Sequence, residues 1–270
     1  GLHFFSPANI MRLLEIVVPD KVSNDVVATG FYLAKLMKKI PVRAGVCDGF
    51  IGNRILNKYG DCAYFIMEDG ATPYEIDKAI FEFGYPMGPF QMFDLAGGDI
   101  GWAMRKRLEP MRDKNERYVH IPDKLCEKGW FGQKTGRGFY RYDQGNRRGN
   151  EDPEVLEIIN LERQKKGIIP IKFSQEEIIR RYMAAMINEA SNVVHEKIAL
   201  RPSDVDVTKL YGYGFPRYRG GPMKYADSYG LDKILDDIRE FEKEDPVFWK
   251  PSNLIIELVR NGNNFDSLNE

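Results

Sequence analysis

A histidine and a glutamate near the start of the chain have the types and spacing of a proton-transfer pair. His3 lies in an apolar run at residues 2–5, and Glu15 follows twelve residues later in a second run at residues 13–17. Both runs favour β-strands, and the polar turn at residues 6–9 between them predicts that the strands fold against each other. His3 and Glu15 would then lie close together.

Such a pair can act as a general base. The carboxylate of Glu15 would hold one ring nitrogen of His3 protonated and stabilise the imidazolium, which leaves the other nitrogen to exchange a proton with a substrate. The alternative is a core histidine beside a strand-end glutamate, with no part in catalysis. Spacing alone favours this alternative, because many half-buried strands carry such residues.

Two further polar residues could contact a ligand. Asn53 is expected on the first turns of a long helix, where its amide could hold a substrate oxygen or make a hydrogen bond between helices. Lys134 lies in a glycine-dense loop, but Gln133 stands where a Walker-type phosphate loop needs glycine, and no helix follows. Lys134 could still reach an anionic cofactor, or belong to a solvated turn.

The remaining motifs favour structural roles. No glycine-rich turn of the dinucleotide-binding type lies between a strand and a helix in this chain. His120 and His195 have no partner residues in the sequence and are expected on the surface or on a helix face. The basic turn at residues 217–221 could bind phosphate, although a structural corner is the better interpretation.

Composition narrows the class of protein. The 270 residues include 39 basic and 40 acidic ones, so net charge gives no reason to expect nucleic acid or an anionic membrane as the main partner. Cys47, Cys62 and Cys126 are widely spaced, which favours a reducing compartment and argues against a disulfide framework or a zinc site.

The ends of the chain and its apolar runs bear on location. No apolar run is long enough for a membrane span, and neither a signal-like start nor a peroxisomal Ser-Lys-Leu ending is seen. We therefore expect a cytoplasmic protein, or a peroxisomal one if the source is eukaryotic. Because the chain starts with glycine and enters a strand at once, we expect it to be cut from something longer.

The first 45 residues predict strand, strand, helix and strand, with the helix at 24–39 and the last strand at 41–44. So short a segment cannot bury both of its faces, which predicts the closing part of an α/β sheet rather than a complete domain. After it the pattern is helical. Asp48 is expected to cap a long helix, and Thr72 opens a capping box for a helix that ends at Gly84.

An internal repeat organises the helical part. Gly-Tyr-Pro and Gly-Pro motifs followed by Asp, Gly and Asp occupy residues 84–99. Residues 214–232 repeat them with phenylalanine in place of the tyrosine and with identical spacing after the second proline. A capping box at Ser174 opens a second long helix that parallels the one expected at Asp48. Two homologous helical units in tandem are therefore predicted, with a charged linker between them.

In this order and combination, the motifs resemble those of the 3-hydroxyacyl-CoA dehydrogenases of fatty-acid β-oxidation. The match covers about the first 142 residues. The second repeat looks like the duplicated C-terminal domain of the multifunctional β-oxidation enzymes, in which an enoyl-CoA hydratase domain precedes the dehydrogenase. The matching segments are residues 3–7, 14–15, 49–54, 84–89 and 134–140.

The resemblance implies a mainly α fold, in which a remnant of an α/β Rossmann-type NAD-binding domain precedes two tandem, homologous helical domains. Residues 1–45 would be the remnant and 46–142 the first helical domain. Residues 143–173 would be the linker and 174–270 the second helical domain. This second domain would give structural support, in place of the partner subunit that monofunctional relatives acquire by dimerising.

The resemblance also implies roles for five residues. The catalytic dyad of the family falls on His3 and Glu15, and its substrate-positioning asparagine falls on Asn53. A cofactor-contacting position, commonly asparagine in the family, is Ser6 here, and Lys134 matches a lysine near the cofactor. No metal is implied.

The function implied is NAD-dependent oxidation of a (3S)-3-hydroxyacyl-CoA. The NAD-binding half would lie before residue 1, so the fragment alone is expected to be inactive. The implied partners are an acyl-CoA substrate, upstream NAD-binding and enoyl-CoA hydratase domains of the same chain, and a thiolase subunit, with no nucleic acid and no membrane span. The alternatives are a non-catalytic helical module for acyl-CoA binding or assembly, and a 3-hydroxybutyryl-CoA dehydrogenase.

Overall fold

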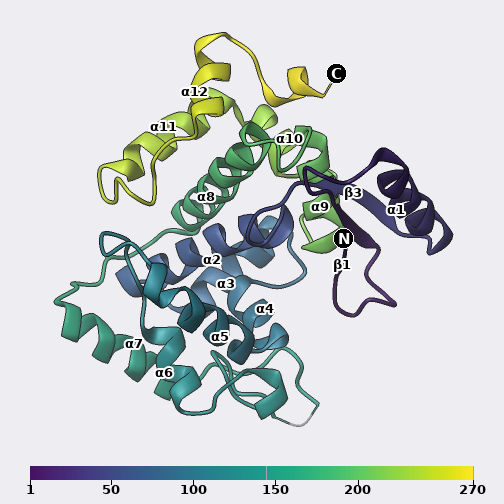
Figure 1. The fold of residues 1–270 in the computed structure, drawn as a ribbon. Helices are drawn as coiled ribbons and strands as arrows, with labels where there is room; N and C mark the ends of the chain where they lie inside the picture. The colour runs from purple at the N-terminus through teal and green to yellow at the C-terminus, as the bar shows by residue number, and fades with distance from the viewer. Residues whose placement is uncertain (144, 270) are drawn as a thin grey trace. The chain divides into compact units, whose positions relative to one another are not determined.

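The computed structural model describes residues 1–143 and 145–269, in which three short strands come first and helices dominate the rest (Figure 1). This confirms the predicted mainly α fold with a small α/β piece at its start. The opening elements are β1 (Leu2–Phe4), β2 (Leu13–Val17), α1 (Asn24–Leu36) and β3 (Ile40–Ala44). The later helices are α2 (Gly52–Asp69), α3 (Pro73–Phe83), α4 (Pro89–Ala96), α5 (Gly98–Leu108), α6 (Ile121–Glu127), α7 (Pro153–Lys166), α8 (Gln175–His195), α9 (Pro202–Gly212), α10 (Pro222–Tyr229), α11 (Leu231–Glu242) and α12 (Asn253–Arg260).

The chain forms two compact units. One combines Gly1–Tyr59 with Arg181–Glu270, and the other is Gly60–Arg180. Both divisions fall inside helices, namely α2 and α8, so each of these helices contributes to both units. The domain bounds expected from the repeat divide the chain by internal similarity, whereas these two units divide it by contacts. The expected bounds therefore stay a prediction. Within the described residues, no helix is both long and apolar enough to cross a membrane.

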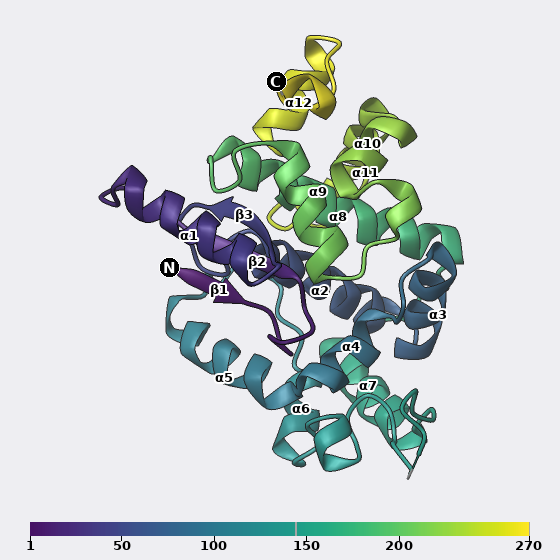
Figure 2. The same cartoon turned by 90° about the vertical axis from the view of Figure 1, so that its right-hand side faces the viewer.

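The sheet is a three-stranded mixed sheet in the order β1-β2-β3 (Figure 2). β1 runs antiparallel to β2, and β2 is parallel to β3 with α1 as the crossover between them. Gly30 lets α1 approach the sheet, because a Cβ there would come within 3.2 Å of Ile16. The predicted helix at 24–39 ends earlier, at Leu36, since Lys38 has a positive φ of 54°.

The start of α2 differs from the prediction. This helix begins at Gly52, four residues after Asp48. Gly49 and Phe50 have φ angles of 81° and 49°, which lie outside the range of a right-handed helix. Glu15 on β2 caps the helix, because its Oε1 accepts hydrogen bonds from the amides of Ile51 and Gly52. The sequence around residue 48 does not indicate a hydrogen-bond acceptor as far away in the chain as residue 15.

The repeated Gly-Pro motif marks a helix start that is capped by an aspartate carboxylate. In the unit of residues 60–180, Asp77 on α3 accepts hydrogen bonds of 2.9 Å from the first amides of α4, those of Phe90 and Gln91. A Cβ at Gly88, just before this helix, would lie 2.3 Å from the same aspartate. Glycine is therefore needed before Pro89, because the carboxylate passes where a side chain would be.

The second repeat makes the same contacts within the other unit. Asp206 on α9 accepts hydrogen bonds from the amides of Met223 and Lys224 at 2.8 and 3.2 Å, and a Cβ at Gly221 would lie 2.3 Å from it. A second pair of aspartates follows the same rule, because Asp94 and Asp227 each accept two backbone amides at 2.9 Å. The repeat found in the sequence is thus a repeated set of hydrogen bonds from backbone amides to aspartate side chains.

Asp77 predicts a pH dependence of stability. Burial raises the pKa of Asp77 to about 7, against the opposing effect of its hydrogen-bond donors. Because the folded state holds the proton more tightly than the unfolded state, the stability that Asp77 contributes is full at acid pH and falls between about pH 4 and 7, by at most about 1.4 kcal/mol per pH unit. In urea unfolding, the stability advantage of the wild type over Asp77→Asn should therefore shrink as pH rises.

The matched control is Glu82→Gln, because Glu82 is exposed on the same helix, α3. Its difference from the wild type should change little over the same pH range. An advantage of Asp77 over asparagine that grows toward neutral pH would contradict the prediction, since the amide donors would then outweigh burial.

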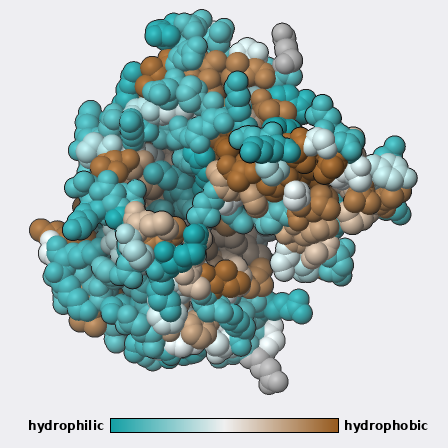
Figure 3. All heavy atoms as spheres, viewed as in Figure 1, coloured by the Kyte–Doolittle hydropathy of each residue, from teal (hydrophilic) through white to brown (hydrophobic). Residues whose placement is uncertain are grey.

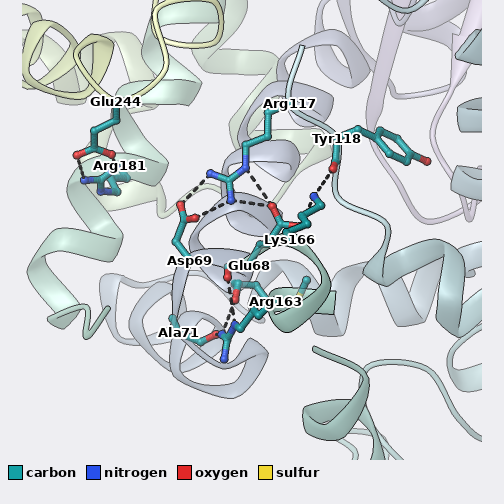
Figure 4. Close-up of polar contacts among 10 residues, drawn as sticks. Glu68, Asp69, Ala71, Arg117, Tyr118, Arg163, Lys166, Arg181 and Glu244 are labelled. Carbon is teal, nitrogen blue, oxygen red and sulfur yellow. Dashed lines mark hydrogen bonds and ion pairs between the residues drawn. The ribbon is translucent and has the colours of Figure 1, made fainter. Parts of the chain in front are cut away.

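The C-terminal end of α2 is closed by α7, within the unit of residues 60–180 (Figure 4). Buried Arg163 donates hydrogen bonds to the carbonyl oxygens of Met67, Glu68 and Ala71 at 2.6, 3.1 and 3.0 Å. These carbonyls are among the groups that a helix end leaves without partners, so the arginine stabilises the end of α2. The charged segment after residue 142 therefore includes a helix that packs against its neighbour.

Candidate active site

His3 and Glu15 face each other across the antiparallel pair of β1 and β2, where they stand in direct register. His3 Nδ1 and Glu15 Oε2 are 2.6 Å apart. The Glu15 side chain is fully buried, whereas that of His3 is 27% exposed. Among the residues that the structure describes, Nε2 of His3 has no hydrogen-bond partner, so this nitrogen is available to a ligand.

Glu15 serves the histidine and the helix at once. Its Oε1 accepts hydrogen bonds from the amides of Ile51 and Gly52 at 3.2 and 2.9 Å, at the start of α2. A helix N-terminus carries partial positive charge, which favours a carboxylate in this place. With Oε1 fixed by the two amides, Oε2 is left to bind His3. The carboxylate therefore determines both where α2 begins and how the imidazole is held.

Two aromatic rings flank the imidazole of His3. The centroid of Phe5 lies 4.7 Å from that of His3, and the centroid of Phe50 lies 5.4 Å from it. Phe50 adopts a left-handed backbone conformation, which is uncommon for a bulky residue. Residues held in this way cluster at functional sites, and here the conformation places the ring beside His3.

Asn53 lies on the first turn of α2, in the same compact unit as the dyad. Its Oδ1 accepts a hydrogen bond of 2.7 Å from the hydroxyl of Tyr213, which follows the end of α9. The Tyr213 ring in turn meets Phe5 edge to face, with centroids 5.6 Å apart. The structure thus connects Asn53 to the aromatic wall around His3, which no local pattern in the sequence predicted.

An ion-pair network holds the first turns of α2 against α8. The Arg54 guanidinium pairs with Glu189 at 2.5 Å and with both oxygens of Glu196 at 2.6 and 2.8 Å. A guanidinium bound by two carboxylates has a fixed geometry. Arg54 therefore keeps the neighbouring Asn53 in place relative to the second repeat.

The two residues expected to contact a cofactor belong to different compact units. Ser6 is exposed just after the carboxyl end of β1. Lys134 belongs to a short 3₁₀ turn in the unit of residues 60–180, where its ammonium group is ion-paired with Asp99. Both roles stay predictions. Within residues 1–143 and 145–269, no cluster of three potential metal-ligating side chains was found.

Two residues near the site were missed in the sequence, Lys209 and Tyr213. Lys209 on α9 is fully buried, and its Nζ lies 3.8 Å from the centroid of the Tyr213 ring. Both residues lie at least 150 positions from the residues that they contact on α2. The only signal available was a lysine and a tyrosine four positions apart, which place both on one helix face.

Comparisons with known proteins agree with this geometry. Residues 49–142 and 178–266 match the family described as 3-hydroxyacyl-CoA dehydrogenase, C-terminal domain. Residues 1–47 match the 3-hydroxyacyl-CoA dehydrogenase, NAD binding domain. The two segments of the C-terminal-domain match confirm the predicted tandem arrangement.

Individual relatives share most of this chain. The peroxisomal bifunctional enzyme of Danio rerio is 44% identical over 276 residues, covering 97% of this chain and 38% of that protein. The glyoxysomal fatty acid beta-oxidation multifunctional protein MFP-a of Brassica napus is 38% identical, with 95% and 36% covered. The crystal structure of the dehydrogenase part of multifunctional enzyme 1 from C. elegans is 30% identical with a TM-score of 0.72, covering 95% of this chain and 58% of that one. The chain therefore spans well under half the length of these curated relatives.

Proposed function

Because this chain belongs to the 3-hydroxyacyl-CoA dehydrogenase family, we propose that it is the C-terminal part of an NAD-dependent (3S)-3-hydroxyacyl-CoA dehydrogenase in a multifunctional enzyme of fatty-acid β-oxidation. The observation that carries the proposal is the 2.6 Å contact between His3 and Glu15, with Glu15 anchored on the start of α2. This is the geometry of a general base with its orienting carboxylate.

In the proposed reaction, Nε2 of His3 accepts the proton of the 3-hydroxyl group. Glu15 stabilises the resulting imidazolium through Nδ1. NAD, when bound, supplies the acceptor for the hydride that leaves the substrate. Because Tyr213 occupies Oδ1 of Asn53, the amide hydrogens of Asn53 are left to donate to the substrate oxygen.

The chain itself supplies only a short part of an NAD site. Its match to the NAD-binding domain is limited to residues 1–47, and a glycine-rich phosphate turn is absent from the sequence. Ser6 fits a contact with NAD, because it is exposed just after the end of β1 and its hydroxyl can donate or accept a hydrogen bond. Lys134 would have to exchange its partner Asp99 for the cofactor. We therefore propose that this chain alone is inactive.

An apolar surface over β1 and α1 supports a larger α/β domain. Apolar atoms gather on this side of the molecule (Figure 3). Leu2, Phe4, Val26 and Leu36 are 38 to 61% exposed there. Patches of this kind usually meet another protein surface. The rest of the NAD-binding domain is the proposed occupant, with β1 as the edge strand that a further strand would join.

Location and partners follow from the relatives. They are described as peroxisomal or glyoxysomal, which favours the peroxisome over the cytoplasm for this protein as well. Because those relatives are bifunctional or multifunctional and far longer than this chain, we propose that an enoyl-CoA hydratase domain accompanies it. An acyl-CoA substrate belongs to the same proposal, and a thiolase subunit is a further possible partner.

The test is NADH oxidation with acetoacetyl-CoA, with a protein that carries this chain behind its NAD-binding half and with the chain alone. We expect turnover in the first and none in the second. Acyl-CoA binding without turnover in either would contradict the proposal and favour the non-catalytic module. Comparing acetoacetyl-CoA with long-chain 3-ketoacyl-CoA substrates separates a 3-hydroxybutyryl-CoA dehydrogenase from an enzyme of broader chain length.

A further inference from the structure

Two side chains of the second repeat reach the first turn of α2, although neither belongs to the motifs that define the proposed site. They are Lys209 and Tyr213. We propose that Tyr213 is a positioning residue that fixes the amide of Asn53, and that Lys209 holds the Tyr213 ring in place. The inference rests on the proposed function, because it assigns a purpose to Asn53.

The hydrogen bond between Tyr213 and Asn53 selects one orientation of the amide. The Tyr213 hydroxyl donates to Oδ1 of Asn53 over 2.7 Å. Burial raises the pKa of Tyr213 well above its ordinary value, so the hydroxyl stays a donor throughout the neutral range. An amide whose oxygen is held in this way presents its NH₂ group to a ligand. A substrate oxygen that becomes negatively charged requires such a donor.

Gly52 is the point at which the contacts meet. Its amide donates to Glu15, and its carbonyl oxygen lies 3.4 Å from Nζ of Lys209. A Cβ at this residue would stand 2.4 Å from the Tyr213 hydroxyl. Glu15, Lys209 and Tyr213 therefore converge on one residue, which adjoins Asn53.

Lys209 is an unusual residue to bury. Besides Gly52, its Nζ contacts the Tyr59 hydroxyl at 3.2 Å and lies over the rings of Tyr59 and Tyr213. Burial lowers its pKa well below the ordinary value, and the negative charge of Glu15 acts in the opposite direction. A buried amine costs stability unless its contacts compensate. This cost is consistent with a lysine retained for the geometry of the site rather than for the fold.

The first repeat supports this interpretation. The aspartates that cap α4 and α10 align the two repeats with an offset of 129 residues, from Asp77 to Asp206. With the same offset, Ile80 of the first repeat corresponds to Lys209 of the second, and Ile80 is a buried residue of the core. The repeat therefore folds with an apolar residue at this position. Lysine occurs in the copy that contacts the start of α2.

The test is a double-mutant cycle between Tyr213→Phe and Asn53→Ala in the active protein that includes the NAD-binding half. Tyr213→Phe alone should lower kcat roughly 5- to 50-fold with little change in KM, because it frees the amide but removes no apolar contact. In the Asn53→Ala background the same change should have an effect of less than about twofold, since no amide is left to orient. Independent, multiplying effects would overturn the inference.

Two further variants sharpen the result. Lys209→Met keeps the volume of the side chain and removes the amine. It should lower kcat when residue 213 is tyrosine, but it should have little further effect in a protein that already carries Tyr213→Phe. Tyr211→Phe is the matched control, because Tyr211 lies on α9 two residues before Tyr213. This substitution should leave kcat unchanged. Thermal unfolding of each variant shows whether a loss of rate reflects a loss of fold.

The outcomes separate the two proposals. If Asn53→Ala keeps the wild-type rate, the proposed role of Asn53 is wrong and the positioning role fails with it. If Asn53→Ala loses activity while Tyr213→Phe keeps it, the site stands and only the positioning role of Tyr213 is wrong.

Discussion

Glutamine in place of His3 is expected to lower kcat for acetoacetyl-CoA reduction by about 10²- to 10⁴-fold, the range typical of a lost general acid or base. The glutamine amide can keep a hydrogen bond to Oε2 of Glu15, which His3 contacts at 2.6 Å. It cannot take up or release the proton of the reacting oxygen. The expected loss is therefore mainly in kcat rather than in the fold or in substrate binding.

The measurement is the steady-state rate of NADH oxidation by the protein that includes the NAD-binding half, with circular dichroism to compare the folds. His195→Gln is the matched control, because His195 is an exposed histidine at the end of α8. This control should keep its activity. A His3→Gln rate within about threefold of the wild type would exclude His3 as the base.

Glutamine in place of Glu15 is expected to cause a loss of similar size, about 10²- to 10⁴-fold, by a different route. The buried amides of Ile51 and Gly52 require an acceptor, so the glutamine oxygen should keep the place of Oε1. The glutamine NH₂ group would then face Nδ1 of His3 and force that nitrogen to accept. The ring proton would move to Nε2, which could no longer act as the base.

Two variants at this position separate catalysis from capping. Glu15→Gln should lower the free energy of unfolding by only about 1–2 kcal/mol, since an acceptor for the helix remains. Glu15→Ala should lower it by about 3–5 kcal/mol, because it leaves the histidine and two buried amides without their partner. Urea unfolding and kcat should be measured together. A Glu15→Gln protein with full activity would mean that Glu15 only caps α2.

Much of the site could be predicted from local sequence. Two apolar runs on either side of a polar turn predict two paired strands, and the structure places His3 directly opposite Glu15. The capping signals at Thr72 and Ser174 also predict where helices begin, whereas the one at Asp48 does not. Thr72 forms the expected capping box with Glu75, and Ser174 Oγ accepts a hydrogen bond from the amide of Glu177. These features depend on contacts between near neighbours in the chain.

The features that the sequence did not predict depend on distant contacts. The start of α2 is determined by Glu15, an acceptor 36 and 37 residues away from the amides that it binds. Tyr213 reaches Asn53 across 160 residues, and Lys209 reaches Gly52 across 157. Neither periodicity nor motif spacing reports contacts of this range, because the residues meet only in the folded chain.

The repeat stands between these cases. Its Gly, Pro and Asp positions were visible in the sequence, yet their physical reason was not. Only the structure shows that Asp77 and Asp206 cap the helices that follow Gly88 and Gly221. Both copies have glycine at this place because the aspartate lies so close to the backbone that a Cβ would overlap it.

The most direct test of the account is chemical rescue of His3→Gly by imidazole. The variant, in the protein that includes the NAD-binding half, should oxidise (3S)-hydroxybutyryl-CoA with NAD very slowly. Added imidazole can occupy the space of the lost ring, and the rate should rise in proportion to the concentration of its neutral form, the form that accepts a proton. Turnover close to the wild-type rate without imidazole would contradict the claim that His3 carries the proton.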